Sequence, residues 1–515
     1  MKLQKKPWID NEIQDKIKKR EKLRRKFIKA KDKTTRDKYH SEYKEIRNQI
    51  VTLCREKKKE CYQNYFTNNS KDLRNTWKGI NEIIKIKEKR KPQPSSILID
   101  DQISNDPTKV ANAFNKYFST IAEKLQRNIF NAGKGFEKYL KGENRNSFFL
   151  YPTSKEEILD TINTQTNNKA SGPNSIPNII LQLIKLDIAG PIADLTNQSF
   201  EKGIYFDKLK VSNAIPIYKD KGSELECSNY RPISLLSNVN KIIEKLMYKR
   251  LYEFLENQNS LYKHQYGFRK KHSAIHALIS MTEDIRNALD NDQIVCGVFL
   301  DLQKAFDTID HDILLKKLEF YGVRGITNNW FRSYLTNRQQ FVTINGFKSE
   351  EATMNFGVPQ GSILGPLLFS IYINDLHSAV QFSTARHFAD DTNLIIKNKS
   401  AKNLTRDLNK DLRCLTKWLR ANKISLNAGK SKLIIFRSKW KKIEYDIKVK
   451  LDGKRHIPTN YLKYLRLYID CHLDWDVHTN VIASKLARSV GMLAKIRHYV
   501  NLNQLHSIYF AIFSS

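Results

Sequence analysis

Two adjacent aspartates, Asp390 and Asp391, lie among apolar residues and limit the possible folds more than any other feature. Ala385 precedes them and Leu394-Ile395-Ile396 follows. Carboxylates in such surroundings cost free energy unless a cation or hydrogen bonds compensate them. Neighbouring side chains of a strand point to opposite faces, so the pair can face one way only at a tight turn. The pattern predicts a metal-bearing turn between strands, although an exposed, solvated acidic turn has the same local sequence.

A third carboxylate, Asp301, follows residues 298–300, whose apolar character predicts a buried strand. We expect a helix over residues 302–307, so Asp301 would lie where a strand passes into a helix. Three carboxylates gathered at such a strand end can hold two divalent cations that bridge nucleotide phosphates. Magnesium prefers oxygen ligands of this kind. Asp at this junction is also an ordinary helix N-cap, so the position alone leaves both interpretations open.

A glycine-rich stretch separates these acidic segments, and glycines let a backbone approach a ligand closely. The motifs are FLDLQKAFDTIDH at 299–311, GVPQGSILGPLLF at 357–369 and FADDTNLII at 388–396. Together they resemble the palm of a reverse transcriptase, and their wording is similar to that of non-LTR retrotransposons, jockey-like elements in particular. Because the three motifs stand in the family's order and at plausible spacing, the set is far more specific than any one of them.

Shorter matches extend the resemblance in both directions, over roughly residues 155–475. Upstream, KASGPNSIP (169–177) resembles the block before the fingers, and AIPIYK (214–219) and NYRPIS (229–234) resemble the fingers. YGFR (266–269) is similar to the segment leading into the palm, and NAGKSKLIIF (427–436) to its end.

The resemblance implies roles for the three carboxylates. Asp301, Asp390 and Asp391 match the family's metal-binding triad, and the backbone carbonyl of Leu302 would add an oxygen ligand. They would clamp the triphosphate and activate the primer hydroxyl. The implied cofactor is a pair of Mg²⁺ ions, which Mn²⁺ could replace.

Five residues match the family's nucleotide pocket. Phe306 corresponds to the bulky gate that favours deoxynucleotides over ribonucleotides, although a Phe is more often a core residue. Gln360 and Gly361 match the loop that touches the incoming sugar and base. Arg231 suits phosphate and aromatic faces through its planar fork. Lys219 would be a point charge on the triphosphate, although its polar surroundings also fit a plain turn.

Two residues are expected to contact primer or template: Lys430 at the end of the palm, and Arg466 just after it. The family usually has Tyr-Leu-Gly where this chain has Tyr464-Leu465-Arg466. If that glycine has a positive φ, an Arg there costs about 1 kcal/mol or more, which puts primer handling in doubt. Residues 505–515 predict an amphipathic helix, and because family members continue further, the thumb is expected to be truncated.

The charge agrees with a nucleic-acid-binding enzyme. The chain has 89 Lys and Arg against 54 Asp and Glu, a formal net charge of +35, and such an excess attracts phosphate backbones. Much of it lies in residues 9–65, which predict long basic helices. These helices could bind template RNA or could be a solvated pair packed on the fingers. Another helix is expected over residues 108–125.

Six scattered cysteines lack zinc-ligand spacing, and neither a membrane span nor a secretory signal is recognisable. We therefore expect an intracellular protein, in cytoplasm and nucleus as a ribonucleoprotein, without a membrane partner. No endonuclease, zinc knuckle or RNase H module is recognisable, so the chain is expected to be the middle of a longer product.

The predicted fold is α+β, a right-hand polymerase with an antiparallel palm sheet backed by helices. The expected divisions are a basic, mostly helical extension (1–145), a pre-fingers segment (146–197), fingers and palm (198–473) and a truncated helical thumb (474–515). The predicted function is RNA-directed DNA polymerisation, with an RNA template, a DNA primer or target and deoxynucleoside triphosphates as partners. The alternatives are an inactive remnant that binds RNA and, less consistent with Phe306, an RNA-dependent RNA polymerase.

Overall fold

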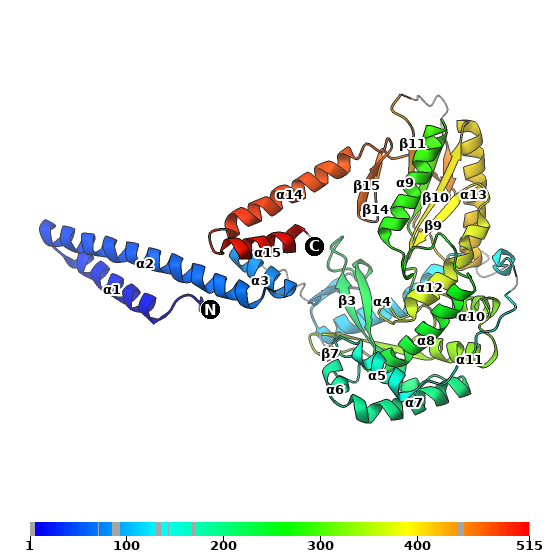
Figure 1. The fold of residues 1–515 in the computed structure, drawn as a ribbon, viewed down its shortest axis with the longest axis horizontal. Helices are drawn as coiled ribbons and strands as arrows, with labels where there is room; N and C mark the ends of the chain where they lie inside the picture. The colour runs from blue at the N-terminus through cyan, green and yellow to red at the C-terminus, as the bar shows by residue number, and fades with distance from the viewer. Residues whose placement is uncertain are drawn as a thin grey trace. The chain divides into compact units, whose positions relative to one another are not determined.

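The computed structural model describes residues 6–70, 72–84, 93–129, 135–142, 144–166, 170–440 and 447–513. It forms two compact units (Figure 1), Met1–Arg90 with His478–Ser515, and Lys91–Val477. Lys169, the first residue of the block expected before the fingers, lies outside the described residues. No helix in the described part of the chain combines the length and the apolar character needed to cross a bilayer.

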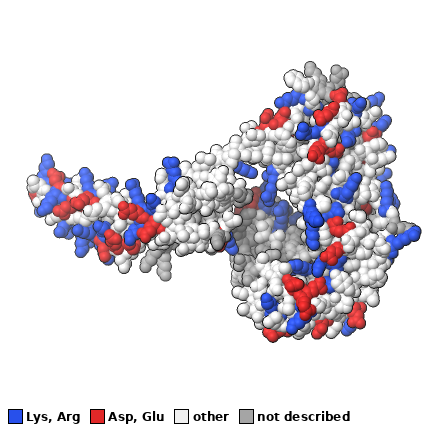
Figure 2. All heavy atoms as spheres, viewed as in Figure 1, with Lys and Arg blue, Asp and Glu red and all other residues white. Residues whose placement is uncertain are grey.

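The smaller unit is helical, and it confirms the basic helices expected over residues 9–65. Its helices are α1 (Asn11–Lys29), α2 (Lys33–Asn68), α3 (Leu73–Ile84), most of α14 (Asp476–Ile496) and α15 (Leu502–Phe513). Leu23 of α1 packs on Ile46 and Ile50 of α2. Figure 2 shows Lys and Arg interspersed with Asp and Glu over this helical pair. The visible face of the pair therefore has mixed charge.

A four-stranded antiparallel sheet forms the centre of the larger unit, in the order β11-β5-β10-β9. These strands are β5 (Ile294–Leu300), β9 (Thr384–Phe388), β10 (Asp391–Asn398) and β11 (Lys432–Phe436). Every residue of β5 is buried, because helices cover both faces of the sheet. Val295 and Phe299 face α9 (Ala274–Asp290), whereas Cys296 and Val298 share a core with α13 (Ala401–Ala421).

A second sheet combines parallel and antiparallel pairs, in the order β4-β3-β6-β7 with β8 also on β6. It contains β3 (Val211–Tyr218), β4 (Tyr230–Leu235), β6 (Arg338–Ile344), β7 (Phe347–Lys348) and β8 (Ala352–Met354). The helix expected over residues 108–125 is present as α4 (Pro107–Arg127), and its Phe114 lies against Tyr230 with ring centroids 4.8 Å apart. This contact joins α4 to the sheet core.

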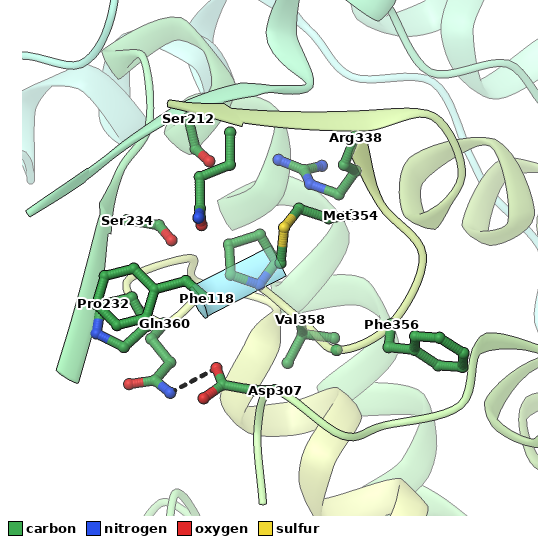
Figure 3. Close-up of a pocket in the computed structure, with 13 residues that line it drawn as sticks. Phe118, Ser212, Pro232, Ser234, Asp307, Arg338, Met354, Phe356, Val358 and Gln360 are labelled. Atoms are coloured by element: carbon green, nitrogen blue, oxygen red, sulfur yellow. Dashed lines mark hydrogen bonds between the residues drawn. The ribbon is translucent and has the colours of Figure 1, made fainter. Parts of the chain in front are cut away.

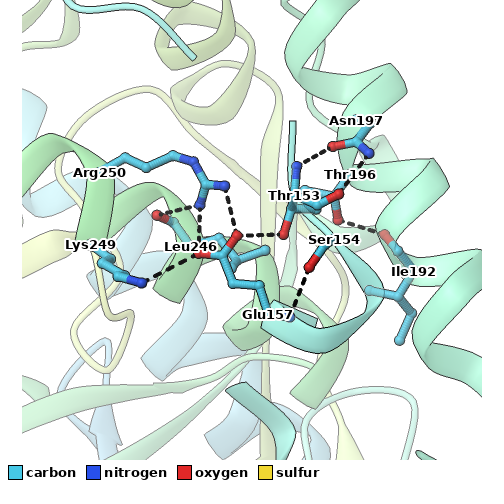
Figure 4. A network of polar contacts seen from close by, with 9 residues as sticks. All are labelled: Thr153, Ser154, Glu157, Ile192, Thr196, Asn197, Leu246, Lys249 and Arg250. Atoms are coloured by element: carbon cyan, nitrogen blue, oxygen red, sulfur yellow. Dashed lines mark hydrogen bonds and ion pairs between the residues drawn. The ribbon is translucent and has the colours of Figure 1, made fainter. Parts of the chain in front are cut away.

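A layer of helices completes the larger unit. They are α5 (Lys155–Asn163), α6 (Asn178–Leu183), α7 (Lys185–Lys202), α8 (Asn238–Asn257), α10 (His311–Phe320), α11 (Gly325–Leu335) and α12 (Gly365–Ile373). Figure 4 shows how α5 is tied to α8: Arg250 donates to the Glu157 carboxylate at 2.8 Å, and Thr153 donates to the same group at 2.7 Å. Because the Arg250 side chain is fully buried, loss of its partner would leave an uncompensated charge.

Three small hairpins stand apart from the two sheets. They are β1 (Ile97–Ile99) with β2 (Gln102–Ser104), β12 (Val449–Leu451) with β13 (Lys454–His456), and β14 (Tyr461–Tyr464) with β15 (Leu467–Asp470). Strands and helices are thus mixed without a repeating parallel unit, which confirms the α+β class at this coarse level.

The helix expected over residues 302–307 is wrong. Residues 303–308 form successive turns, in which Lys304 has a φ of +48°, and α10 begins only at His311. The N-cap of that helix is Asp310, which accepts from the backbone N–H of Ile313 at 3.0 Å. A residue with positive φ cannot continue a right-handed helix, so the apolar spacing after Asp301 reflects turn packing instead.

Candidate active site

Asp301 lies directly after β5, and the segment that precedes β11 (Lys432–Phe436) holds its backbone. Its N–H donates to the hydroxyl of Ser431 at 3.2 Å, and its carbonyl accepts from the N–H of Asn427 at 2.8 Å. The next residue, Leu302, forms an isolated antiparallel bridge with Leu426. The two bonds of this bridge use the carbonyl of Asp301 and the N–H of Gln303. The carbonyl of Leu302 therefore turns to the opposite side, as alternation along a strand requires.

The paired aspartates occupy the turn between β9 and β10, as the sequence predicts. Phe388 pairs with Asp391, so Ala389 and Asp390 form a two-residue connection. Ala389 has a φ of +57°, a conformation that two-residue hairpin turns require and that costs energy for a residue other than glycine. In the register of β10 with β5, Thr392 faces Leu300. Asp391 precedes Thr392 and Asp301 follows Leu300. Because the strands are antiparallel, both aspartates lie at the same end of the sheet.

A neighbouring segment supports this turn from the side. Tyr266 donates its N–H to the carbonyl of His387 at 2.8 Å, and the next residue is Gly267. A Cβ atom at Gly267 would come within 2.1 Å of the backbone nitrogen of Ala389. Only glycine permits this approach, so the YGFR motif packs its backbone directly against the acidic turn.

The three carboxylates act on one another electrostatically. Desolvation by the surrounding protein, together with repulsion from Asp390 and Asp301, raises the pKa of Asp391 to about 6. Desolvation also raises the pKa of Asp390, and Asp301 adds to this, whereas the Arg231 guanidinium opposes it. The site thus concentrates negative charge that a cation would relieve.

Four basic residues act on one another electrostatically, namely Lys219, Arg231, Lys304 and Lys430, and Arg231 also acts on Asp390. Desolvation, assisted by repulsion from the other three cations, lowers the pKa of Lys219 to about 8. The ammonium group of Lys219 donates to the carbonyl of Ser228 at 2.8 Å. Lys430, which the sequence predicts as a primer or template residue, thus joins the cations predicted for the nucleotide. Such a cluster suits a polyanionic ligand.

The glycine-rich loop joins the second sheet to the segment after Asp301. Its carbonyl at Gln360 accepts from the N–H of Ser234 in β4 at 2.7 Å, and the N–H of Val358 donates to the carbonyl of Phe306 at 3.0 Å. Gly361 has a φ of +129°, and a Cβ atom there would come within 2.6 Å of the carbonyl oxygen of Ser234. Glycine is therefore required by both backbone conformation and close approach.

Phe306 is partly buried and packs against other rings. It stacks on Phe369 with ring centroids 4.7 Å apart and meets Phe268 edge to face at 6.1 Å. The position of Phe306 agrees with both a core residue and a nucleotide gate. Its ring packs against the core, and it lies five positions after Asp301.

Arg466 lies in the turn between β14 and β15, where Tyr464 pairs with Leu467. Leu465 and Arg466 have φ values of +45° and +72°. The positive φ anticipated for this position is therefore present, and an arginine adopts it. The hairpin packs on the central sheet, since Asn393 of β10 donates to the Tyr464 hydroxyl at 2.9 Å.

Two site residues, Lys304 and Asp307, escaped the sequence reasoning. The amide nitrogen of Gln360 donates to the Asp307 carboxylate at 2.7 Å (Figure 3), which leaves the other end of the amide directed elsewhere. The ammonium of Lys304 lies 5.3 Å from the centre of the Tyr117 ring. Both residues lie within the motif FLDLQKAFDTIDH. Their charged side chains in a motif expected to bind ligands were the signal that could have identified them from the sequence.

The cavity in Figure 3 is too small to hold a nucleotide. Gln360, Asp307 and Arg338 are among its lining residues, and its volume is about 30 Å³. That is room for a water or two, whereas ligand pockets measure about 300 Å³ or more. Within the described part of the chain, no three His, Cys, Asp or Glu side chains already stand together as a metal site.

Comparison with known proteins identifies the domain that contains these residues. Residues 217–465 match the family described as reverse transcriptase (RNA-dependent DNA polymerase). This chain carries a reverse transcriptase domain. Asp301, Asp390, Asp391 and the predicted nucleotide-pocket residues all lie inside the matched range, and Arg466 lies one residue beyond it.

Relatives of this reverse transcriptase domain occur in mobile elements of Drosophila melanogaster. The probable RNA-directed DNA polymerase from transposon BS is 29% identical over 342 residues, 64% of this chain and 37% of that protein. The polymerase from mobile element jockey is 28% identical over 393 residues, 73% and 42% of the two chains. The probable polymerase from transposon X-element is 28% identical over 360 residues, 68% and 38%. The predicted jockey-like resemblance is confirmed, and the chain spans about two-fifths of these relatives.

Proposed function

We propose that this chain is an RNA-directed DNA polymerase of a non-LTR retrotransposon, which adds deoxynucleotides to a primer 3′-hydroxyl on an RNA template. The observation that carries the proposal is the strand register that brings Asp391 and Asp301 to one end of the central sheet, where Asp390 also feels the positive charge of Arg231. Polymerases need this combination, because the carboxylates hold metal ions while the cations attract the triphosphate. In this proposal the four-stranded sheet is the palm, the five-stranded sheet belongs to the fingers, and α14 with α15 is a partial thumb.

Asp301, Asp390 and Asp391, with the Leu302 carbonyl, would hold two Mg²⁺ ions, for which Mn²⁺ could substitute. The donor set fits, since hard oxygen ligands with uncompensated negative charge are what magnesium prefers. Bound there, the ions would lower the pKa of the primer hydroxyl and neutralise charge on the phosphates. The support for this assignment is the register that brings Asp391 and Asp301 to one end of the sheet, together with the desolvation that raises the pKa of both Asp390 and Asp391.

The nucleotide would lie between the cations and the glycine-rich loop. Lys219 and Arg231 would attract the triphosphate, and Phe306 would exclude a ribose 2′-hydroxyl, so deoxynucleotides are favoured. Gln360 and Gly361 would contact the sugar and base. An ionised Asp307 carboxylate only accepts hydrogen bonds, so it binds the NH₂ end of the Gln360 amide. The amide oxygen of Gln360 is then free to face the nucleotide.

The proposed partners are an RNA template and a DNA primer or target, with Lys430 and Arg466 as their contacts. A basic surplus of +35 supports nucleic-acid binding in general. We place the protein in ribonucleoprotein particles of the cytoplasm and nucleus.

Primer extension on poly(rA) with oligo(dT), dTTP and Mg²⁺ tests the proposal. The parent protein is compared with an Asp390→Asn/Asp391→Asn double variant, and both are checked for RNA binding. Extension by the parent alone is the expected result. If neither protein extends the primer while both bind RNA in a salt-dependent way, the chain is an inactive RNA-binding remnant and the proposal fails.

A further inference from the structure

A second concentration of positive charge lies on the outer side of α13, whose inner side packs on the central sheet. There a groove of about 580 Å³ runs between α13 and the hairpin of β12 and β13. We call it the outer groove. Its cations are Arg406, Arg413, Lys417 and Arg420 of α13, with Lys448 and Lys450 of β12 and its approach. In Figure 2, Lys and Arg gather along the right-hand edge of the larger unit, where Figure 1 draws α13.

Cations outnumber carboxylates among the described residues that line the outer groove. Among the described lining residues the one carboxylate is Asp452, which forms an ion pair with Arg420 at 3.1 Å. Asp407 lies beside the groove and pairs with Arg406 at 3.0 Å. Arg413 and Lys417, at its centre, are exposed. Like charges held close together repel unless an anion joins them, so the groove fits an anionic ligand.

The two sides of the groove are held at a fixed separation. Asn409 of α13 donates its side-chain amide to the carbonyl of Lys448 at 2.8 Å, and its amide oxygen accepts from the N–H of Lys450 at 2.9 Å. These two hydrogen bonds hold β12 against the helix. Along α13 the cations from Arg406 to Arg420 recur on one face over about 21 Å, given a rise of about 1.5 Å per residue. Such a row suits an extended polyanion rather than a single anion.

The groove continues into a second hollow of about 320 Å³ that shares Thr416, Arg420 and Asp452 with it. Leu426, the bridge partner of Leu302, and Gln303 also line this hollow. The lining of both hollows contains no aromatic ring among the described residues. Bases would therefore find no stacking platform, and recognition would rest on the backbone.

We infer that the outer groove is a second nucleic-acid site, which binds the phosphodiester backbone of a strand without regard to its sequence. It is separate from the proposed polymerase site, so its test needs no primer extension. Backbone binding of this kind is salt-dependent, with a slope of about −0.7 per phosphate contact for a single strand.

The test is fluorescence anisotropy of a labelled, unstructured 30-nucleotide RNA, and of DNA of the same sequence, with the whole chain at several salt concentrations. The groove variant is Arg413→Glu/Lys417→Glu. A matched control, Lys202→Glu/Lys208→Glu, makes the same charge change at two other exposed positions of the larger unit. Arg413→Gln/Lys417→Gln is a milder second variant, and thermal melting confirms that each protein is folded.

We expect the groove variant to bind at least tenfold more weakly and its salt slope to become shallower by about 1.4, from two lost contacts. The control should stay within twofold of the parent. If affinity for RNA and for DNA falls equally, the groove recognises the phosphodiester backbone that both share. If affinity falls for only one of them, that nucleic acid is the ligand of the groove. Equal effects of groove and control variants would overturn the inference. So would poly-glutamate that binds as tightly as RNA and loses as much on substitution, because the groove would then suit an acidic protein.

Discussion

Two hairpin turns of the larger unit share an unfavourable positive φ but differ in the charged groups around them. The β9–β10 turn has Ala389 at a φ of +57°, and the β14–β15 turn has Leu465 and Arg466 at +45° and +72°. At the first turn, Asp390 and Asp391 interact electrostatically with Asp301 and Arg231, which come from distant segments. At the second, the structure gathers no comparable set of charged groups among the described residues. Backbone strain by itself therefore does not mark a site; the charges that meet there do.

The largest effect on primer extension should come from removing the charge of Asp301, which lies beside the first turn but follows a different strand, β5. We expect Asp301→Asn to lower primer extension by more than about 1,000-fold, because each metal-binding carboxylate supports several kcal/mol of transition-state stabilisation. Thermal melting should change little. Asp312→Asn, an exposed residue of α10, is the control. Full activity of Asp301→Asn would break the distinction between the two turns.

Phe306 tests the substrate side of the first turn. We expect Phe306→Ala to raise the use of ribonucleotides relative to deoxynucleotides by about tenfold or more, because removing a clashing ring relieves about 1–3 kcal/mol of discrimination. Extension with UTP against dTTP measures the ratio. Phe369→Ala, which removes the ring stacked on Phe306, controls for general loosening. An unchanged ratio would remove the gate assignment.

Asp307 tests whether the loop facing the first turn depends on an oriented amide. We expect Asp307→Asn to raise the KM for dTTP about tenfold with little change in kcat, because a hydrogen bond to a charged group contributes about 1.5–3 kcal/mol. The double variant Asp307→Asn/Gln360→Glu keeps the net charge and reverses the direction of the hydrogen bond. It should recover part of the affinity. If the double variant is worse than both single variants, Asp307 has no positioning role.

The cation cluster should give the first turn a pH dependence. Since the pKa of Lys219 is lowered to about 8, this side chain loses its charge, and its attraction for the triphosphate, as the pH rises through 8. We expect kcat/KM for dTTP to fall several-fold between pH 7.5 and 9. Lys219→Arg, whose guanidinium stays charged, should abolish that decline. A decline that persists in the arginine variant would assign it to another group.

The smallest effect separates strain from function at both turns. Arg466→Gly and Ala389→Gly should each stabilise the protein by about 1 kcal/mol, because glycine adopts positive φ without a steric cost. Urea unfolding measures this. Arg466→Ala, which removes the charge and keeps the strained residue type, should show no such gain. Ala389→Gly should also lower primer extension because its turn holds the carboxylates, whereas Arg466→Gly and Arg466→Ala should lower it equally because both remove the proposed primer or template contact.

Sequence reasoning reached the reverse transcriptase family and the α+β class because ordered motifs and strand periodicity are local in the chain. It also found the acidic turn and the helices around residues 9–65 and 108–125. It was wrong at residues 302–307, where apolar spacing suggested a helix and positive φ at Lys304 prevents one. The roles of Asp301, Asp390, Asp391 and the pocket residues stay predictions until activity is measured.

By itself the sequence determined the motifs and the large surplus of positive charge, and it predicted that the carboxylates and the glycine-rich loop carry the chemistry. Only the tertiary structure decided which of them meet. Lys430 joins Lys219, which precedes it by more than 200 residues, and Asp307 orients Gln360. Asn409 of α13 holds β12 in place, so that Lys450 lines the outer groove together with the arginines of α13. The physical reason is that spacing along a strand or helix fixes only which face a side chain occupies, whereas proximity between segments depends on strand register and on how the cores pack.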